Sequence, residues 1–231
     1  MSQEIQIDSL PAEFGWDVFA KAWKLFKRHW GNYMALTWGW MIPATLINYY
    51  IAKIPLLPIK VILTLAMAGG ASGAAFIILR VQRRLLESQG TVDLIEAVKL
   101  ATQNLNLNAV LVLGAIAATG QIVSIFSGMS FLYLLCILVT NLLTYYYVFL
   151  CEVKNLDPVS ACKFSVRAVM FNILPMIVTF LTIMLWSILS VFTLFTGLLV
   201  LLPVSVLASL LFANEIFGGA NFAIANDDTQ K

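Results

Sequence analysis

Uncharged, mostly apolar stretches dominate the chain and alternate with short charged segments. If His29 is neutral, four such stretches contain 24, 19, 52 and 47 residues, and they cover 29–52, 61–79, 100–151 and 168–214. A helix of about 20 apolar residues crosses the roughly 30 Å hydrocarbon core of a bilayer. The two shorter stretches therefore fit one transmembrane helix each, and the two longer ones fit two each.

Turn residues near the middle of each long stretch divide it into two helices. The first turn is predicted at Ser127–Ser130 and the second at Thr193–Gly197. Between the first two helices, Pro55 and Pro58 interrupt any continuous helix. The predicted fold is thus an all-α integral membrane protein with six transmembrane helices arranged as three hairpins. The spans are expected at about 31–52, 61–79, 109–127, 131–151, 172–192 and 196–213.

A similar short pattern precedes each predicted hairpin. It consists of Ala, any residue, Lys and an apolar residue, with a basic or amide residue four positions after the Lys on the same helical face. The three copies are Ala22-Trp23-Lys24-Leu25 with Arg28, Ala97-Val98-Lys99-Leu100 with Gln103, and Ala161-Cys162-Lys163-Phe164 with Arg167. The pattern predicts a threefold unit, in which an amphipathic helix in the headgroup layer precedes each hairpin. Ordinary loops, whose basic residues only set orientation, are the alternative.

The first of these helices has the clearest amphipathic pattern. Aromatic residues recur every three or four positions, at Trp16, Phe19, Trp23, Phe26 and Trp30. This spacing predicts one apolar face along the segment. We expect a single membrane domain over 1–231, with a cytoplasmic amphipathic part at 1–30 and a frayed cytoplasmic tail at 214–231.

The composition excludes several classes of protein. Hydrophobic residues make up 61% of the 231 residues and charged residues 11%, against about half and about 25% in soluble domains. A soluble enzyme, a nucleic-acid-binding protein and a disordered chain are therefore excluded. The net charge of +2 is too small to indicate a polyanionic partner.

Lysine and arginine are distributed unevenly over the predicted loops. With the N-terminus on the inside, 12 of the 14 basic residues lie on the cytoplasmic side, and Lys53 and Lys60 lie on the other. This is the arrangement that the positive-inside rule describes. We therefore predict a multi-pass protein of the bacterial inner membrane with both termini in the cytoplasm. The N-terminal region lacks the pattern of a cleaved signal peptide, so the first span is expected to serve as the targeting signal.

Residues able to carry out chemistry are few. His29 is the single histidine, and the cysteines at 136, 151 and 162 lack a metal-binding or redox spacing. No acidic residue falls within a predicted span, which argues against a proton- or ion-coupled pump. We predict no catalytic residue, cofactor or metal site, and hence no enzyme.

Basic residues on the cytoplasmic side are the candidate ligand contacts. Each Lys or Arg near an anionic membrane surface contributes about 1 kcal/mol of attraction. The candidates for contact with lipid headgroups are Lys21, Lys24, Lys27, Arg28, Arg80, Arg83, Arg84, Lys99, Lys163 and Arg167. Setting the orientation of the chain is the alternative role of these residues.

Small residues and prolines within the predicted spans bear on helix packing. Gly69 and Gly73 lie four residues apart, a spacing that lets two helices approach closely, within this chain or between two copies. Pro43, Pro175 and Pro203 are expected to kink or break their spans. Broken helices form binding sites in some transporters.

Two segments carry a resemblance to known bacterial families. They are Gly15-Trp16 with Ala22–Trp30, and Pro158–Ala168, each of which leads into a span. In this layout the chain resembles the YciC-like inner-membrane proteins and the membrane domain attached to some glycerophosphodiesterases. The resemblance implies a six-span bacterial inner-membrane protein. It carries over no functional residue, because the diesterase catalytic domain has no counterpart here.

These patterns predict a non-enzymatic integral protein of the inner membrane. It is expected to act through anionic lipid headgroups or a membrane-protein partner, without nucleic acid, as an accessory, scaffold or envelope-homeostasis factor. The alternative, motivated by the threefold pattern and the prolines, is a transporter or channel for a small apolar or amphiphilic solute.

Overall fold

The computed structural model describes residues 7–88, 93–127, 139–140, 143–191 and 196–218. All regular structure within these ranges is helical, which confirms the predicted all-α class. The helices are α1 (Phe14–Arg28), α2 (Trp30–Ala52), α3 (Leu57–Glu87), α4 (Leu94–Ala101), α5 (Leu107–Ser127), α7 (Tyr147–Val153), α8 (Pro158–Phe171), α9 (Ile173–Val191) and α10 (Thr196–Ile216).

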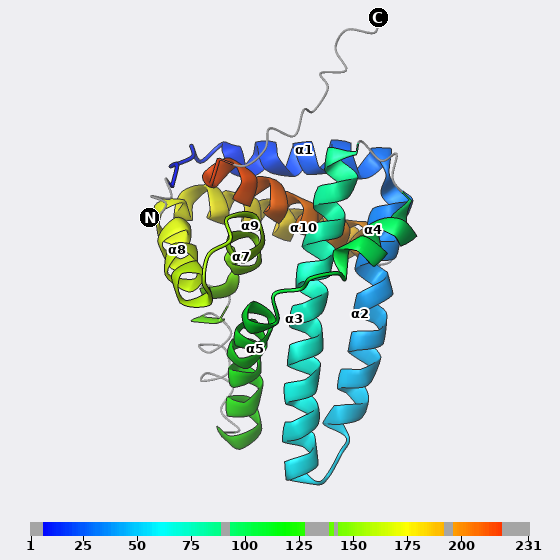
Figure 1. The fold of residues 1–231 in the computed structure, drawn as a ribbon. Helices are drawn as coiled ribbons and strands as arrows, with labels where there is room; N and C mark the ends of the chain where they lie inside the picture. The colour runs from blue at the N-terminus through cyan, green and yellow to red at the C-terminus, as the bar shows by residue number, and fades with distance from the viewer. Residues whose placement is uncertain (1–6, 89–92, 128–138, 141–142, 192–195, 219–231) are drawn as a thin grey trace, which may run out of the picture.

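The helices form two groups, which meet where α1 and α10 pack on α2. In the first group, α3 packs against α2 on one side and against α5 on the other. In the second, α1 packs on both α9 and α10, and these two pack on each other. Figure 1 shows that α1, α9 and α10 run crosswise over one end of the α2–α3–α5 group, while the α2–α3 connection lies at the opposite end.

Three of the described helices are long and apolar enough to cross a membrane. They are α3 with 31 residues, the segment Ile173–Ser190 of α9 and the segment Leu199–Ile216 of α10. Helix α2 is long enough, but its tryptophans, tyrosines and asparagines lower its mean hydropathy. Residues 131–138, 141 and 142 of the predicted span at 131–151, and 128–130 of the predicted turn, lie outside the described residues. In the described part of this span, turn residues at 145–146 precede the short helix α7, so this part is not one continuous helix. Three of the six predicted spans therefore meet this criterion, which indicates a multi-pass membrane protein.

Two large apolar faces are exposed on the surface of the fold. The face on α9 consists of Ile173, Leu174, Ile177, Phe180, Leu181, Met184, Leu185, Trp186, Ile188 and Leu189. The face on the far halves of α2 and α3 includes Ile42, Leu46, Ile47, Ile59, Ile62, Leu63 and Leu65. Continuous apolar surface of this kind is unfavourable in water. Lipid contact is the environment that both faces fit.

A short helix directly precedes each of α2, α5 and α9. A single residue makes the break in two places: His29 (φ −136°, ψ 41°) before α2 and Asn172 (φ −116°, ψ 32°) before α9. The break before α5 is longer and contains Asn104, which has a φ of 53° in the left-handed region. Asparagine tolerates this conformation better than most residues. The chain can therefore change direction between each short helix and the apolar helix that follows it.

The prolines in the predicted spans do not break their helices. Helix α2 continues through Pro43 and α10 continues through Pro203. Pro175 lies in the first turn of α9, where its missing N–H has no helical partner to lose. None of the three prolines therefore breaks its helix, and broken helices no longer support the transporter alternative.

Gly15 allows the backbones of α1 and α9 to touch. A Cβ at this position would collide with the Pro175 carbonyl oxygen and would lie 2.8 Å from the Thr179 nitrogen. The Thr179 hydroxyl also lies 3.3 Å from the Gly15 carbonyl oxygen, to which it donates. The crossing point of the two helices is thus set by the absence of a side chain.

Replacement of Gly15 tests this contact. We expect Gly15→Ala to destabilise the fold by about 2 kcal/mol, because overpacking at a rigid backbone contact forces helices apart. The measurement is thermal unfolding of the purified protein in detergent. Gly31→Ala is the matched control: a Cβ there meets nothing within 4 Å, and Ala is favoured over Gly in a helix. Equal melting temperatures for the two variants would show that α1 does not pack on α9 at Gly15.

Candidate lipid-contact site

Helix α1 has one face inside the protein and one face exposed. Val18, Phe19, Ala22 and Phe26 are buried in the core to which α9 and α10 contribute. The predicted single aromatic face is therefore wrong. Positions 19 and 26 lie about 60° around the helix from the row of tryptophans seven residues apart, and that rotation is enough to bury them.

The tryptophans of the row stay on the surface. The exposed fractions are 51% for Trp16 and 39% for Trp23 on α1, and 63% for Trp30, which is the first residue of α2. Amphipathic indole rings are typical of the membrane–water interface. The buried and exposed sides of α1 are thus distinct.

A cation lies beside one of these indoles, and others are exposed on the same helix. The Lys27 ammonium lies 5.6 Å from the centroid of the Trp23 ring, within the range of a cation–π interaction. Lys24 and Arg28 are exposed and form no ion pair within the described part of the chain. Lys21 is half-buried, and its ammonium lies 5.4 Å from the Phe14 ring. Three exposed cations at the C-terminal end of α1 are therefore available to an anion.

Arg80 is not available in this way. Its Nε and Nη2 atoms donate to the two carboxylate oxygens of Glu152 at 2.6 and 2.8 Å. Nη1 donates to the carbonyl oxygens of Ala101 and Gln103 at 3.1 and 2.7 Å, and Nη2 also donates to that of Asn104 at 3.2 Å. Since all five N–H donors of a guanidinium are occupied, the structure gives Arg80 an internal role instead of the predicted headgroup contact.

The other two arginines of the predicted cluster differ from each other. Arg83 forms an exposed ion pair with Glu87 one turn later, with 2.6 Å between Nε and Oε1. Arg84 is half-buried and forms no ion pair among the described residues. With Arg80, Gln103 and neighbouring residues they line a polar cavity of about 330 Å³. Within this cluster Arg84 is thus the cation best placed to meet an anion.

The three copies of the sequence pattern occupy matching environments. Ala22, Ala97 and Ala161 are each 0% exposed. The lysines two positions later, Lys24, Lys99 and Lys163, are all exposed, as is Arg167. The guanidinium of Arg167 lies 5.5 Å from the Phe171 ring. In each short helix, therefore, the alanine faces the protein and the lysine faces outwards.

Gly69 and Gly73 lie at the contact between α3 and α5. A Cβ on Gly114 of α5 would lie 3.1 Å from the Gly69 Cα, and a Cβ on Gly73 would lie 3.8 Å from the Val110 side chain. The structure thus places both glycines at a contact within one chain. Small residues at this spacing are typical of closely packed membrane helices.

Asn172 is a buried polar residue whose role the sequence did not reveal. Its side chain is completely buried and accepts a hydrogen bond from the Leu10 backbone N–H at 2.8 Å. Its amide group donates to the carbonyl oxygens of Asp8 and Ala168 at 3.1 and 3.2 Å. Asn172 therefore holds the segment before α1 against the α8–α9 junction. Its position between an amphipathic and an apolar segment was the available signal.

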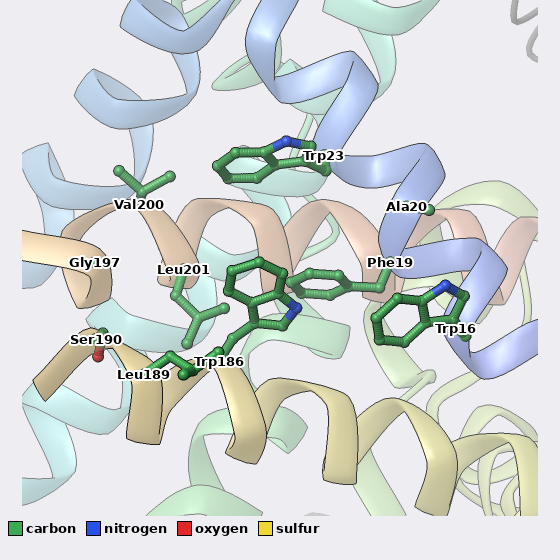
Figure 2. Close-up of a pocket in the computed structure, with 10 residues that line it drawn as sticks. All are labelled: Trp16, Phe19, Ala20, Trp23, Trp186, Leu189, Ser190, Gly197, Val200 and Leu201. Carbon is green, nitrogen blue, oxygen red and sulfur yellow. The ribbon is translucent and has the colours of Figure 1, made fainter. Parts of the chain in front are cut away.

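A groove opens where α1, α9 and α10 meet. It has a volume of about 570 Å³. Its walls include Trp16 and Trp23 of α1, Trp186 and Leu189 of α9, and Val200 and Leu201 of α10, whose side chains Figure 2 shows around the open space. Phe19 stacks against Trp186 with 6.3 Å between the ring centroids. Sequence patterns did not predict this groove, because its walls come from both ends of the chain.

The histidine and the two described cysteines lie in different parts of the fold. His29 lies at the α1–α2 junction, where its backbone N–H donates to Phe26 and its carbonyl accepts from Asn32 and Tyr33. Cys151 and Cys162 are free thiols, burial raises the pKa of the Cys162 thiol, and Cys136 lies outside the described residues. Within the described ranges, no three His, Cys, Asp or Glu side chains come close enough to hold a metal ion.

Comparison of the chain with known protein families, with characterised proteins and with solved structures found no match. The resemblance to the YciC-like proteins and to the diesterase membrane domain therefore stays a prediction.

The internal role of Arg80 can be tested by substitution. We expect Arg80→Lys to destabilise the fold by about 2 kcal/mol, because lysine keeps the charge but loses the fork that holds Glu152 and three carbonyl groups. Thermal unfolding in detergent measures the effect. Arg83→Ala removes an exposed pair and should cost no more than about 0.5 kcal/mol. A smaller loss for Arg80→Lys than for Arg83→Ala would contradict the assignment.

Proposed function

We propose that the chain is a six-span, non-enzymatic protein of the bacterial inner membrane with both termini in the cytoplasm. The exposed apolar faces of α9 and of the far halves of α2 and α3 support insertion in lipid. The positions of the charges support the orientation. Lys53 directly follows α2 and Lys60 lies in the first turn of α3, so both belong to the α2–α3 connection. Figure 1 shows that this connection lies at the opposite end from α1 and the C-terminal end of α3.

The protein acts at its basic end through anionic lipid headgroups, as an accessory or scaffold protein. One observation carries this proposal: helix α1 exposes both Trp16 and Trp23 and the cations Lys24, Lys27 and Arg28 at its C-terminal end, and the Lys27 ammonium lies 5.6 Å from the Trp23 ring. Indole rings favour the interface, and cations beside them attract anionic headgroups. Arg84, Lys99, Lys163 and Arg167 extend the contact; Arg80 does not, because its donors are occupied.

The proposed orientation predicts which positions an impermeant thiol reagent reaches. In a chain whose cysteines are replaced by serine, we expect Ile54→Cys and Thr193→Cys to react in intact spheroplasts, and Gln103→Cys to react only after lysis. Residue 193 is the informative position, because α9 and α10 run crosswise to α3 in the fold (Figure 1). Labelling of residue 193 only after lysis would place the α9–α10 hairpin on the cytoplasmic face and reduce the number of spans.

The proposed headgroup contact predicts selective lipid retention. We expect Lys24→Gln, Lys27→Gln and Arg28→Gln together to lower co-purified phosphatidylglycerol relative to phosphatidylethanolamine by at least about tenfold, since each cation contributes about 1 kcal/mol at an anionic surface and a tenfold change corresponds to about 1.4 kcal/mol. Native mass spectrometry after extraction in a lipid-preserving polymer measures the ratio. The control replaces Lys53 and Lys60 with glutamine at the opposite end. An unchanged ratio in the triple variant would reject the headgroup contact.

A further inference from the structure

The groove between α1, α9 and α10 offers an occupant almost only apolar surface. Three of its walls are indole rings, those of Trp16, Trp23 and Trp186, and the rest is mainly aliphatic. Ser190 supplies the one hydroxyl group among the lining residues, and this hydroxyl donates to the Ser187 carbonyl oxygen of its own helix at 2.7 Å. The occupant is therefore expected to be apolar along its length.

Positive charge lies at one end of the same groove. Trp23, which lines the groove, carries the Lys27 ammonium on its ring at 5.6 Å. Lys24 and Arg28 are exposed on the same end of α1, whereas the acidic Asp17 lies towards its other end. A ligand with an apolar chain in the groove and a negative group near Lys27 would match both features. The volume of about 570 Å³ falls within the usual range of small-molecule sites.

We propose that this groove holds one acyl chain of an anionic phospholipid from the bilayer, with its headgroup near Lys24 and Lys27. The inference rests on the proposed function, since it assigns a binding site for an acyl chain to the same lipid whose headgroup contacts α1. A bilayer lipid is the occupant that the charge pattern favours. A second copy of this chain docked through α1 would bring like cations together.

The test uses the full-length protein in lipid nanodiscs with a photoreactive probe. The probe is phosphatidylglycerol with a diazirine in the middle of one acyl chain, and phosphatidylcholine with the same chain is the comparison. Peptide mass spectrometry locates the label. We expect phosphatidylglycerol to label Val200 and Leu201 of the groove wall in preference to phosphatidylcholine. Phe180 and Leu181, which are exposed on α9 and do not line the groove, report contact with bulk lipid.

A variant that fills the groove separates a site from general lipid contact. Ala20 lines the groove and is exposed, so that Ala20→Trp fills the space from its surface. We expect labelling of Val200 and Leu201 to fall at least about tenfold, equivalent to about 1.4 kcal/mol, with labelling of Phe180 unchanged. Ala12→Trp adds the same side chain at an exposed position outside the groove. Leu189→Trp is a second filling variant on α9.

The outcomes distinguish this inference from the proposed function. If lipid retention stays selective for phosphatidylglycerol but the filling variants leave groove labelling unchanged, the proposed acyl-chain site is wrong, whereas the headgroup contact is retained. Equal groove labelling by phosphatidylglycerol and phosphatidylcholine overturns the anionic identity of the occupant. Labelling of Val200 and Leu201 by neither lipid, with Phe180 and Leu181 still labelled, overturns the lipid assignment.

Discussion

The guanidinium of Arg80 is the interaction on which the arrangement around α3 depends. It joins α3 to Glu152 of α7 and to three carbonyl groups between α4 and α5, so one side chain links segments that are far apart in the chain. The two side chains of the pair are only 21% and 11% exposed. An arginine removed from water to this extent is tolerated only when its donors are paired. Helix α3 also packs closely on α5, at Gly69 and Gly114.

The second constraint is the position of α1, which packs this N-terminal helix against the C-terminal helices α9 and α10. The missing side chain of Gly15 brings α1 onto α9, and the Asn172 amide holds the preceding segment by its backbone. The Asp8 N–H also donates to the Ile216 carbonyl oxygen at the end of α10. Aromatic side chains of α1 lie between this helix and α9 and α10. The groove lies along the edge of α1, where Trp16 and Trp23 form part of its wall (Figure 2). The proposed lipid contacts therefore arise at the junction that closes the fold.

Particular elements show how far sequence patterns reach. The bounds predicted for the spans 31–52, 172–192 and 196–213 agree with those of helices α2, α9 and α10 to within a few residues. These bounds can be predicted because the length of an uncharged stretch is read directly from consecutive residues. The face of α1 was predicted less well: Phe19 and Phe26 were assigned to the same face as the tryptophans, but they are buried. Aromatic spacing cannot show which partner covers which side of a helix. Arg80 looked like Arg83 and Arg84 in the sequence, since its partner Glu152 lies 72 residues away.

The helical class, the membrane-like composition, and the positions of the long apolar helices and of the short helices before them can all be predicted from the order of residues. These properties follow from the burial cost of charge and from the length of helix that a bilayer requires, both of which are read along the chain. The crosswise packing of α9 and α10, the internal role of Arg80 and the groove beside Trp23 became visible only in the folded chain. Each of these depends on contacts between distant segments, where packing and hydrogen-bond satisfaction select one arrangement among many that the same local pattern allows.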